Sequence, residues 1–238
     1  DEVAVLARVL AGICSDDRLV EVKLSTGATL RGWLHESFTL EQARALVGRT
    51  LDLKGAYKQL MVSKSTEWAS VVAVEEPGTG ERKLFVSEAL PFGASARGLG
   101  FNRFSRALAR IGTRLLYLLW VNFFDDFPHL ALQCQGDAPR KTSERFMAIM
   151  GWKVAEDENK AKPFNEKFSA LGVEFDFSES TKGRILVRNK KGRVDELQKS
   201  IAEIIKSGAC TTAVASSVRG RMQYAETEVF GRASAIIM

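Results

Sequence analysis

The sequence predicts an α+β fold with an antiparallel sheet. Segments typical of strands and helices follow one another without repeating as βαβ units, which argues against a parallel sheet. Two segments with alternating apolar residues surround glycine-containing turns, as in β-hairpins. Residues 95–114 have the apolar and charged faces of an amphipathic helix. Together these patterns favour helices packed against antiparallel strands.

Short local patterns define the elements expected in the first 90 residues. Thr39 and Gln42 form a capping-box pattern that opens a short helix, and Gly48 is expected to close it. The other expected elements are a helix over 2–13, a hairpin around Thr26-Gly27, a strand over 50–54, a helical turn over 55–60 and a hairpin over 67–90 with turn residues Pro77, Gly78 and Gly80.

The longest expected helix covers residues 95–114. Phe101, Phe104, Leu108 and Ile111 share its apolar face, and arginines occupy the other face. The elements expected after it are a buried strand over 115–124, a return strand over 127–134, a helix over 139–150 with Phe146, Ile149 and Met150 inward, strands over 151–155, 171–177 and 184–187, and a helix from about Arg193.

The charge, the cysteines, the histidines and the apolar runs indicate which partners, metal sites and cellular compartment to expect. The formal net charge is +5, which suits a polyanionic partner without establishing one. Cys14, Cys134 and Cys210 are widely separated, so we expect no disulfide framework and an intracellular protein of the cytoplasm or nucleus. With two histidines, a histidine-rich zinc site is not expected. The longest apolar run is far shorter than the roughly 20 residues of a membrane span, so we expect no membrane partner.

Three aspartates interrupt apolar segments. Asp125 and Asp126 follow two phenylalanines and precede a third, which places both carboxylates at a predicted tight turn. Two such charges about 4 Å apart repel by roughly 4 kcal/mol at an effective dielectric constant near 20. A solvated turn is the rival interpretation, because Asp is a common turn residue. Asp52 lies between Leu51 and Leu53 in another expected strand, and if the two strands are neighbours the three carboxylates converge.

Converging carboxylates suit a hard cation. Mg²⁺ binds through one or two carboxylates together with waters and substrate phosphates. Two such ions about 3.5–4 Å apart clamp the attacking and leaving oxygens of an in-line phosphoryl displacement. We therefore expect Asp52, Asp125 and Asp126 to hold two Mg²⁺ ions, with Mn²⁺ as an alternative.

Five motifs in order carry a family resemblance. They are LDLKGAYKQL (51–60), LPFGASARGLGFNRF (90–104), FFDD (123–126), NKAK (159–162) and LGVEF (171–175). This order resembles the palm of a reverse transcriptase, an RNA-directed DNA polymerase, of LTR-type and DIRS-type retrotransposons. The resemblance covers about residues 50–177 and, more loosely, the tail to 232. It implies a right-hand polymerase fold: partial fingers over 1–50, a palm over 51–177 with a fingers-side hairpin at about 67–90, and the start of a helical thumb over 178–238.

The resemblance also implies catalytic roles. Asp52 and Asp125 match the metal-binding catalytic aspartates, and Asp126 matches the carboxylate paired with the second of them. Lys160 matches a lysine proposed to protonate the leaving pyrophosphate; a surface lysine is the rival interpretation. LGVEF is similar to the primer-grip hairpin of such enzymes, although a packed strand explains it equally.

For nucleotide binding the resemblance implies Leu53, Tyr57, Phe92 and Gly93. Tyr57 falls where the family places an aromatic ring beneath the sugar, where it would clash with a 2′-hydroxyl and favour deoxynucleotides. A half-buried core aromatic is the rival interpretation. Gly98 stands near a position where the family often has proline, which leaves the conformation of this loop open.

Two basic stretches are expected to contact nucleic acid. They consist of Arg103, Arg106 and Arg110, with Arg114 on the same face, and of Lys182, Arg184, Arg188, Lys190 and Lys191, with Arg193. Phosphate contacts give affinity that depends on salt and not on base sequence. The rival interpretation of the first stretch is a solvated helix face, and that of the second is a disordered linker between a strand and a helix.

The expected function is template-directed addition of deoxynucleotides to a primer 3′-hydroxyl by two-metal phosphoryl transfer. The expected partners are an RNA or DNA template with its primer and deoxynucleoside triphosphates. One rival is an RNA-templated RNA polymerase or a DNA-templated relative that shares the palm. The other is a decayed transposon remnant that binds nucleic acid without catalysis. Patterns typical of RNase H or integrase are not present in the sequence.

Overall fold

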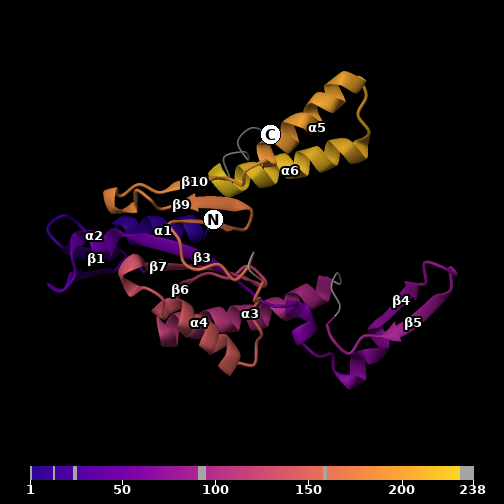
Figure 1. The fold of residues 1–238 in the computed structure, drawn as a ribbon, viewed down its shortest axis with the longest axis horizontal. Coiled ribbons are helices and arrows are strands. Elements are labelled where there is room, and N and C mark those ends of the chain that lie inside the picture. Colours follow the sequence, from indigo (N-terminus) through magenta and orange to yellow (C-terminus); the bar gives the residue numbers. More distant parts are fainter. Residues whose placement is uncertain (1, 13, 24–25, 91–94, 158–159, 231–238) are drawn as a thin grey trace. The chain divides into compact units, whose positions relative to one another are not determined.

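The computed structural model of the chain describes residues 2–12, 14–23, 26–90, 95–157 and 160–230, and it is a mixed α+β structure with several small sheets (Figure 1). The chain forms two compact units. The first contains residues 1–49, 130–136 and 164–238, and the second contains residues 50–129 and 137–163. The unit boundary near residue 50 lies close to a predicted domain boundary, whereas the segments expected as fingers and thumb belong to one unit.

The first unit contains the terminal segments. Its elements are α1 (Glu2–Gly12), β1 (Leu19–Lys23), β2 (Thr29–Trp33), α2 (Leu40–Arg44), β8 (Lys167–Ala170), β9 (Val173–Asp176), β10 (Leu186–Asn189), α5 (Arg193–Ser207) and α6 (Thr212–Phe230). Strands β1 and β2 form the antiparallel hairpin expected around Thr26-Gly27. Strands β10, β9 and β8 form a second antiparallel sheet in that order.

The capping box of α2 is confirmed, but the predicted end of that helix is wrong. Thr39 Oγ1 accepts a hydrogen bond from Gln42 N at 3.1 Å, and Thr39 N donates to Gln42 Oε1 at 2.9 Å. The helix ends at Arg44, and Gly48 lies inside β3 (Leu46–Asp52). A Cβ atom at Gly48 would lie 2.2 Å from Cε1 of Phe168, so this glycine allows close packing and does not cap a helix.

The second unit contains the aspartates. Besides the end of β3 and the start of β7 (Asp126–Leu132), its elements are 3-10 helices at Ala56–Gln59 and Lys64–Ala69, β4 (Val71–Glu75), β5 (Arg82–Val86), α3 (Ser95–Leu116), β6 (Leu119–Trp120) and α4 (Ala138–Ile149). Strands β4 and β5 form the second expected hairpin and are exposed along their whole length. The remaining strands form a sheet with the order β3-β7-β6.

The core of the second unit lies around α3. The buried residues of this cluster are Leu51, Leu53, Ala56, Phe101, Leu108, Ala109, Leu118, Trp120, Phe127, Phe146 and Met147. Phe104, predicted on the apolar face of α3, is 53% exposed, and Ser105 is fully buried in its place. In α4 the predicted burial of Ile149 and Met150 is likewise wrong, because the last turn of the helix passes beyond the core. Met147 is buried beside Phe146 instead.

The strand predicted over 115–124 is largely wrong. Helix α3 continues through Leu116, and Tyr117, which is 84% exposed, ends it with a φ of +54°. A left-handed residue of this kind commonly terminates a helix. Only Leu119 and Trp120 form a strand, because the apolar run is divided between the last helical turn and the short hairpin that follows. Within the described ranges, no helix has the length and apolar character needed to cross a membrane.

Candidate active site

Asp52 is the last residue of β3, and its backbone is fixed by a neighbouring segment. Asp52 O accepts a hydrogen bond from Ala155 N at 2.8 Å, and Leu53 pairs with Val154 in an isolated antiparallel bridge. Leu51 and Leu53 are buried in the core, so strand alternation places the Asp52 side chain on the opposite face. That side chain is 14% exposed, which leaves its carboxylate accessible at the edge of the core.

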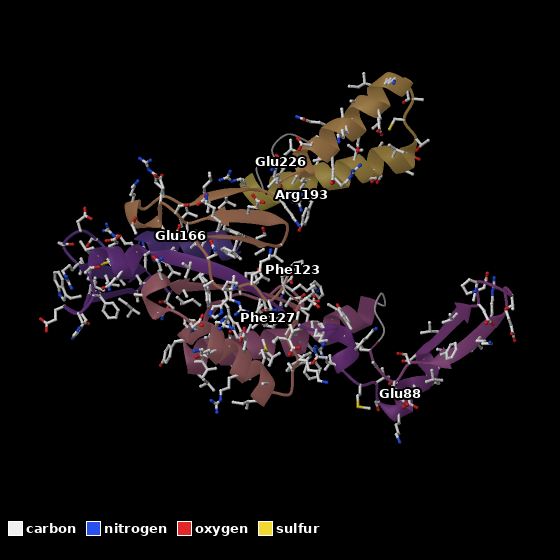
Figure 2. The ribbon with its side chains drawn as sticks, in the orientation of Figure 1. Glu88, Phe123, Phe127, Glu166, Arg193 and Glu226 are labelled. Carbon is white, nitrogen blue, oxygen red and sulfur yellow. The ribbon has the colours of Figure 1, made fainter. Side chains whose placement is uncertain are left out.

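Asp125 and Asp126 belong to a tight turn between β6 and β7. Phe123 N donates to Asp126 O at 2.9 Å, and Asp126 N donates to Phe123 O at 3.0 Å, so Phe124 and Asp125 form a two-residue loop. In the sequence, Phe123 and Phe127 stand before and after the aspartates, and both phenylalanines are labelled in Figure 2. Phe127 is fully buried and anchors the start of β7 in the core, whereas Phe123 is 55% exposed.

Burial and neighbouring charges act on the Asp126 carboxylate. Burial raises the pKa of Asp126 to about 6, with further increases from the negative charges of Asp125 and Asp52 and an opposing effect from Lys160. Burial also raises the pKa of Tyr57, to which the charge of Asp125 adds. The second unit therefore brings Asp52, distant in sequence, into electrostatic range of the Asp125–Asp126 turn.

Lys160 compensates part of this negative charge. Its ammonium group forms an ion pair with Asp52 Oδ2. The pKa of Lys160 is raised, chiefly by the hydrogen bond to Asp52 and by the charge of that carboxylate, with smaller increases from Asp157 and Asp125; its partial burial acts in the opposite direction. The Lys160 side chain is 55% exposed, so the ammonium group can leave Asp52 without opening the core.

The donor set suits an ion that is shared with a substrate. Across the described ranges, no three acidic, histidine or cysteine side chains form a ready cage for a metal ion. Mg²⁺ seldom uses such a cage, because it keeps several waters and takes one or two carboxylates together with phosphate oxygens. The negative charges of Asp125 and Asp52 raise the pKa of Asp126, and a nearby cation would offset this repulsion between carboxylates. Asp52, Asp125 and Asp126 could therefore hold Mg²⁺ once phosphates complete its coordination.

Tyr57 lies on the 3-10 helix Ala56–Gln59 and is half-buried. Its ring stacks on Phe101 with centroids 4.6 Å apart and an interplanar angle of 22°. Gly98 of α3 faces both this ring and the turn, since a Cβ there would lie 3.8 Å from Tyr57 Oη and 3.7 Å from Phe124 Cε1. The core interpretation and the sugar-contact interpretation of Tyr57 are thus compatible: one ring face packs inward, and the ring lies close to Asp125.

The other nucleotide-binding predictions have different outcomes. The side chain of Leu53 is buried in the core, so only its main chain could reach a nucleotide. Phe92 and Gly93 lie outside the described residues.

The two basic stretches are exposed except for Arg193, which is half-buried with its guanidinium 4.9 Å from the centre of the Tyr224 ring. Arg103, Arg106 and Arg110 project from α3 in the second unit, away from the face that holds Phe101 and Leu108. In the first unit, three of the five predicted residues form ion pairs: Lys182 and Arg184 with Glu179 at 3.0 and 3.5 Å, and Arg188 with Asp176 at 3.3 Å. Lys190 and Lys191 follow β10 and are also exposed.

Two residues near the turn were missed by the sequence predictions. The Ser105 hydroxyl donates a hydrogen bond to Phe124 O and accepts one from Asn122 Nδ2 at 3.1 Å. The available signal was the spacing of Ser105, four residues after Phe101 and three before Leu108, which places a small polar residue on the apolar face of α3.

A scan against protein-family models finds no match to this chain, and no curated protein matches it either.

Proposed function

We propose that this chain is the core of a reverse transcriptase, with a palm formed around β3, β6, β7, α3 and α4. The observation that carries the proposal is the grouping of Asp52, Asp125, Asp126 and Lys160 in one unit, where Lys160 pairs with Asp52 and the charges of Asp52, Asp125 and Lys160 all act on the pKa of Asp126. The order of the five sequence motifs supports it as well. The reaction is addition of a deoxynucleotide to a primer 3′-hydroxyl, with release of pyrophosphate.

The residues of the site would have different roles in phosphoryl transfer. Asp52 and Asp125 would hold Mg²⁺, which when bound supplies charge stabilisation to the transferring phosphoryl group. Asp126 begins β7 beside them and adds negative charge. Lys160 lies within ion-pair distance of Asp52, so its ammonium proton would be close to a pyrophosphate leaving that position. The protein otherwise contributes positioning, which is the main requirement of this reaction.

Substrate selection in this proposal depends on Tyr57. Its ring has one face against Phe101 and lies near Asp125, so it can form the floor beneath a deoxyribose. Stacking on Phe101 limits the movement of the ring, so a 2′-hydroxyl at that floor would meet a rigid surface. The exposed arginines of α3 supply positive charge for the phosphates of a template or primer.

The test is primer extension with deoxynucleoside triphosphates and Mg²⁺ on RNA and DNA templates. Asp125→Asn should lower the rate by about 1000-fold, because one lost metal ligand removes several kcal/mol of transition-state stabilisation. Asp137→Asn, which changes an aspartate that pairs with Arg140 away from the site, should retain the activity. Absence of extension by the unmodified chain, or undiminished extension by a folded Asp125→Asn variant, would contradict the proposal.

A further inference from the structure

The turn that presents Asp125 and Asp126 has an unfavourable backbone. Phe124, the first of its two loop residues, has a φ of +52°. Two-residue hairpin loops normally place glycine where the backbone adopts a positive φ, and a bulky side chain there costs of order 1–3 kcal/mol. Strand β6 has only two residues, so the hairpin ladder supplies few hydrogen bonds to hold this conformation. Support from outside the hairpin is therefore required.

Ser105 supplies a contact at the strained residue itself. The Ser105 side chain is fully buried in α3, and its hydroxyl donates to the carbonyl oxygen of Phe124. Asn122 Nδ2 donates to the same hydroxyl oxygen at 3.1 Å. Because an amide nitrogen can only donate, Asn122 occupies a lone pair of the Ser105 oxygen and leaves the hydroxyl proton for Phe124. The three residues thus form a directed hydrogen-bond chain.

Helix α3 also holds the strand before the turn. Trp120 Nε1 donates to Ala109 O at 3.0 Å, and Leu118 N donates to Gly112 O at 3.1 Å. The same helix carries Phe101, on which Tyr57 stacks. One helix face therefore fixes the β6 strand, the aspartate turn and the tyrosine ring with respect to each other.

A second strained turn in the chain is held in the same way. Leu171, between β8 and β9, has a φ of +52°, and Tyr224 Oη donates to its carbonyl oxygen at 2.8 Å. In both turns a hydroxyl from a distant segment binds the carbonyl of the bulky residue with positive φ. The same type of contact therefore occurs at two turns of this protein.

From these contacts we infer that Ser105, oriented by Asn122, is a positioning residue that holds Asp125 and Asp126 in the geometry needed to bind Mg²⁺. This inference rests on the proposed function. Loss of the Ser105 hydroxyl should free the Phe124 carbonyl and let the turn relax toward an unstrained backbone. Displacements of about 1 Å at a reacting centre can cost up to about 100-fold in rate.

The experiment compares Ser105→Ala and Asn122→Asp with the unmodified chain. In Asn122→Asp the new carboxylate attracts the Ser105 proton and withdraws it from Phe124, while the serine itself remains. Ser143→Ala is the matched control, since Ser143 is also fully buried, on α4, and its hydroxyl donates to Arg140 O within its own helix. Cooperative thermal unfolding establishes that each variant is folded.

Two readouts are measured. Amide hydrogen exchange at Phe123 and Asp126 should be about tenfold faster in both turn variants and unchanged in Ser143→Ala. In primer extension, kcat should fall by about 10- to 100-fold with a higher Mg²⁺ concentration at half-maximal rate, while KM for the nucleotide changes by less than about twofold.

The outcomes separate this inference from the proposed function. Unchanged exchange at the turn in Ser105→Ala would overturn the anchoring role, whether or not the chain extends primers. Faster exchange with unaltered kcat and Mg²⁺ dependence would overturn the positioning role. If the unmodified chain fails to extend primers, the proposed function fails, and the exchange measurement still decides whether Ser105 anchors the turn.

Discussion

Asp126 is the residue at which the electrostatics of the site can be measured without any substrate. Its pKa is about 6 in the folded protein, against an ordinary value of 3.8. Between about pH 4 and pH 6 the folded state therefore binds more protons at this position than the unfolded state. The linkage relation then requires the free energy of unfolding to fall as the pH rises through this window. Above about pH 6, Asp126 is ionised in both the folded and the unfolded state, and its charge lowers the free energy of unfolding by the full amount.

Substitution of Asp126 should remove this cost. In metal-free buffer, Asp126→Asn should raise the free energy of unfolding at pH 7.5 by about 1 kcal/mol, a value discounted for solvent screening, and should flatten its dependence on pH between 4 and 6. Urea unfolding at several pH values measures both effects. Glu88→Gln, a change at an exposed carboxylate labelled in Figure 2, is the control and should leave the profile unaltered. A steeper profile in Asp126→Asn would contradict the predicted sign.

At the scale of the element, α3 organises the second unit. Other segments pack on its buried face, which includes Phe101, Ser105, Leu108 and Ala109. Gly112 lies on the same face and has the least space for an added side chain. A Cβ atom there would lie 2.2 Å from Trp120 Cζ2 and 2.7 Å from Trp120 Cε2. Since the Trp120 ring also contacts Phe127 and Phe146, it cannot move away without disturbing the core.

Two glycines of this helix should respond in opposite directions to the same change. Gly112→Ala should destabilise the protein by about 2 kcal/mol, because overpacking outweighs the better helix propensity of alanine. Gly100→Ala should stabilise it by about 0.5–1 kcal/mol, since among the described residues no atom outside the adjacent helix backbone lies within 4 Å of the added Cβ. Urea unfolding of both variants measures the difference. Equal effects at the two positions would show that Trp120 does not pack closely on Gly112.

Elements with local signals could be predicted from the sequence. The hairpins, the capping box of α2 and most of α3 depend on turn residues and periodicity within a few positions. The apolar run from residue 115 to 124 could not be assigned correctly, because periodicity does not distinguish the end of a helix from a short buried strand. Ser105 lies on the buried face where Phe104 was predicted, and its hydroxyl donates to the Phe124 carbonyl, a contact between segments that no local pattern contains.

The candidate site was predictable only in part. Asp52, Asp125 and Asp126 were conspicuous because apolar neighbours surround them. The contacts Lys160–Asp52 and Ser105–Phe124 join segments distant in sequence, so no local pattern contains them. The resemblance to reverse transcriptases predicted a role for Lys160, but only the structure shows that it lies beside Asp52.

At the scale of the whole molecule, the proposed function depends on residues that lie entirely within one compact unit. Asp52, Asp125, Asp126, Lys160 and Tyr57 all belong to the second unit. Nucleotide binding at this site should therefore be a property of that unit. The exposed residues of the two predicted basic stretches belong to different units: those of α3 to the second and those near β10 to the first.

The most direct measurement is a calorimetric titration of the full chain with a deoxynucleoside triphosphate, in the presence and in the absence of Mg²⁺. The carboxylates should repel the triphosphate in metal-free buffer and bind it through the ion when Mg²⁺ is present. We expect binding that requires Mg²⁺ in the unmodified chain and that is lost in Asp125→Asn. Binding of equal strength without Mg²⁺, or in Asp125→Asn, would contradict a metal-dependent nucleotide site at these aspartates.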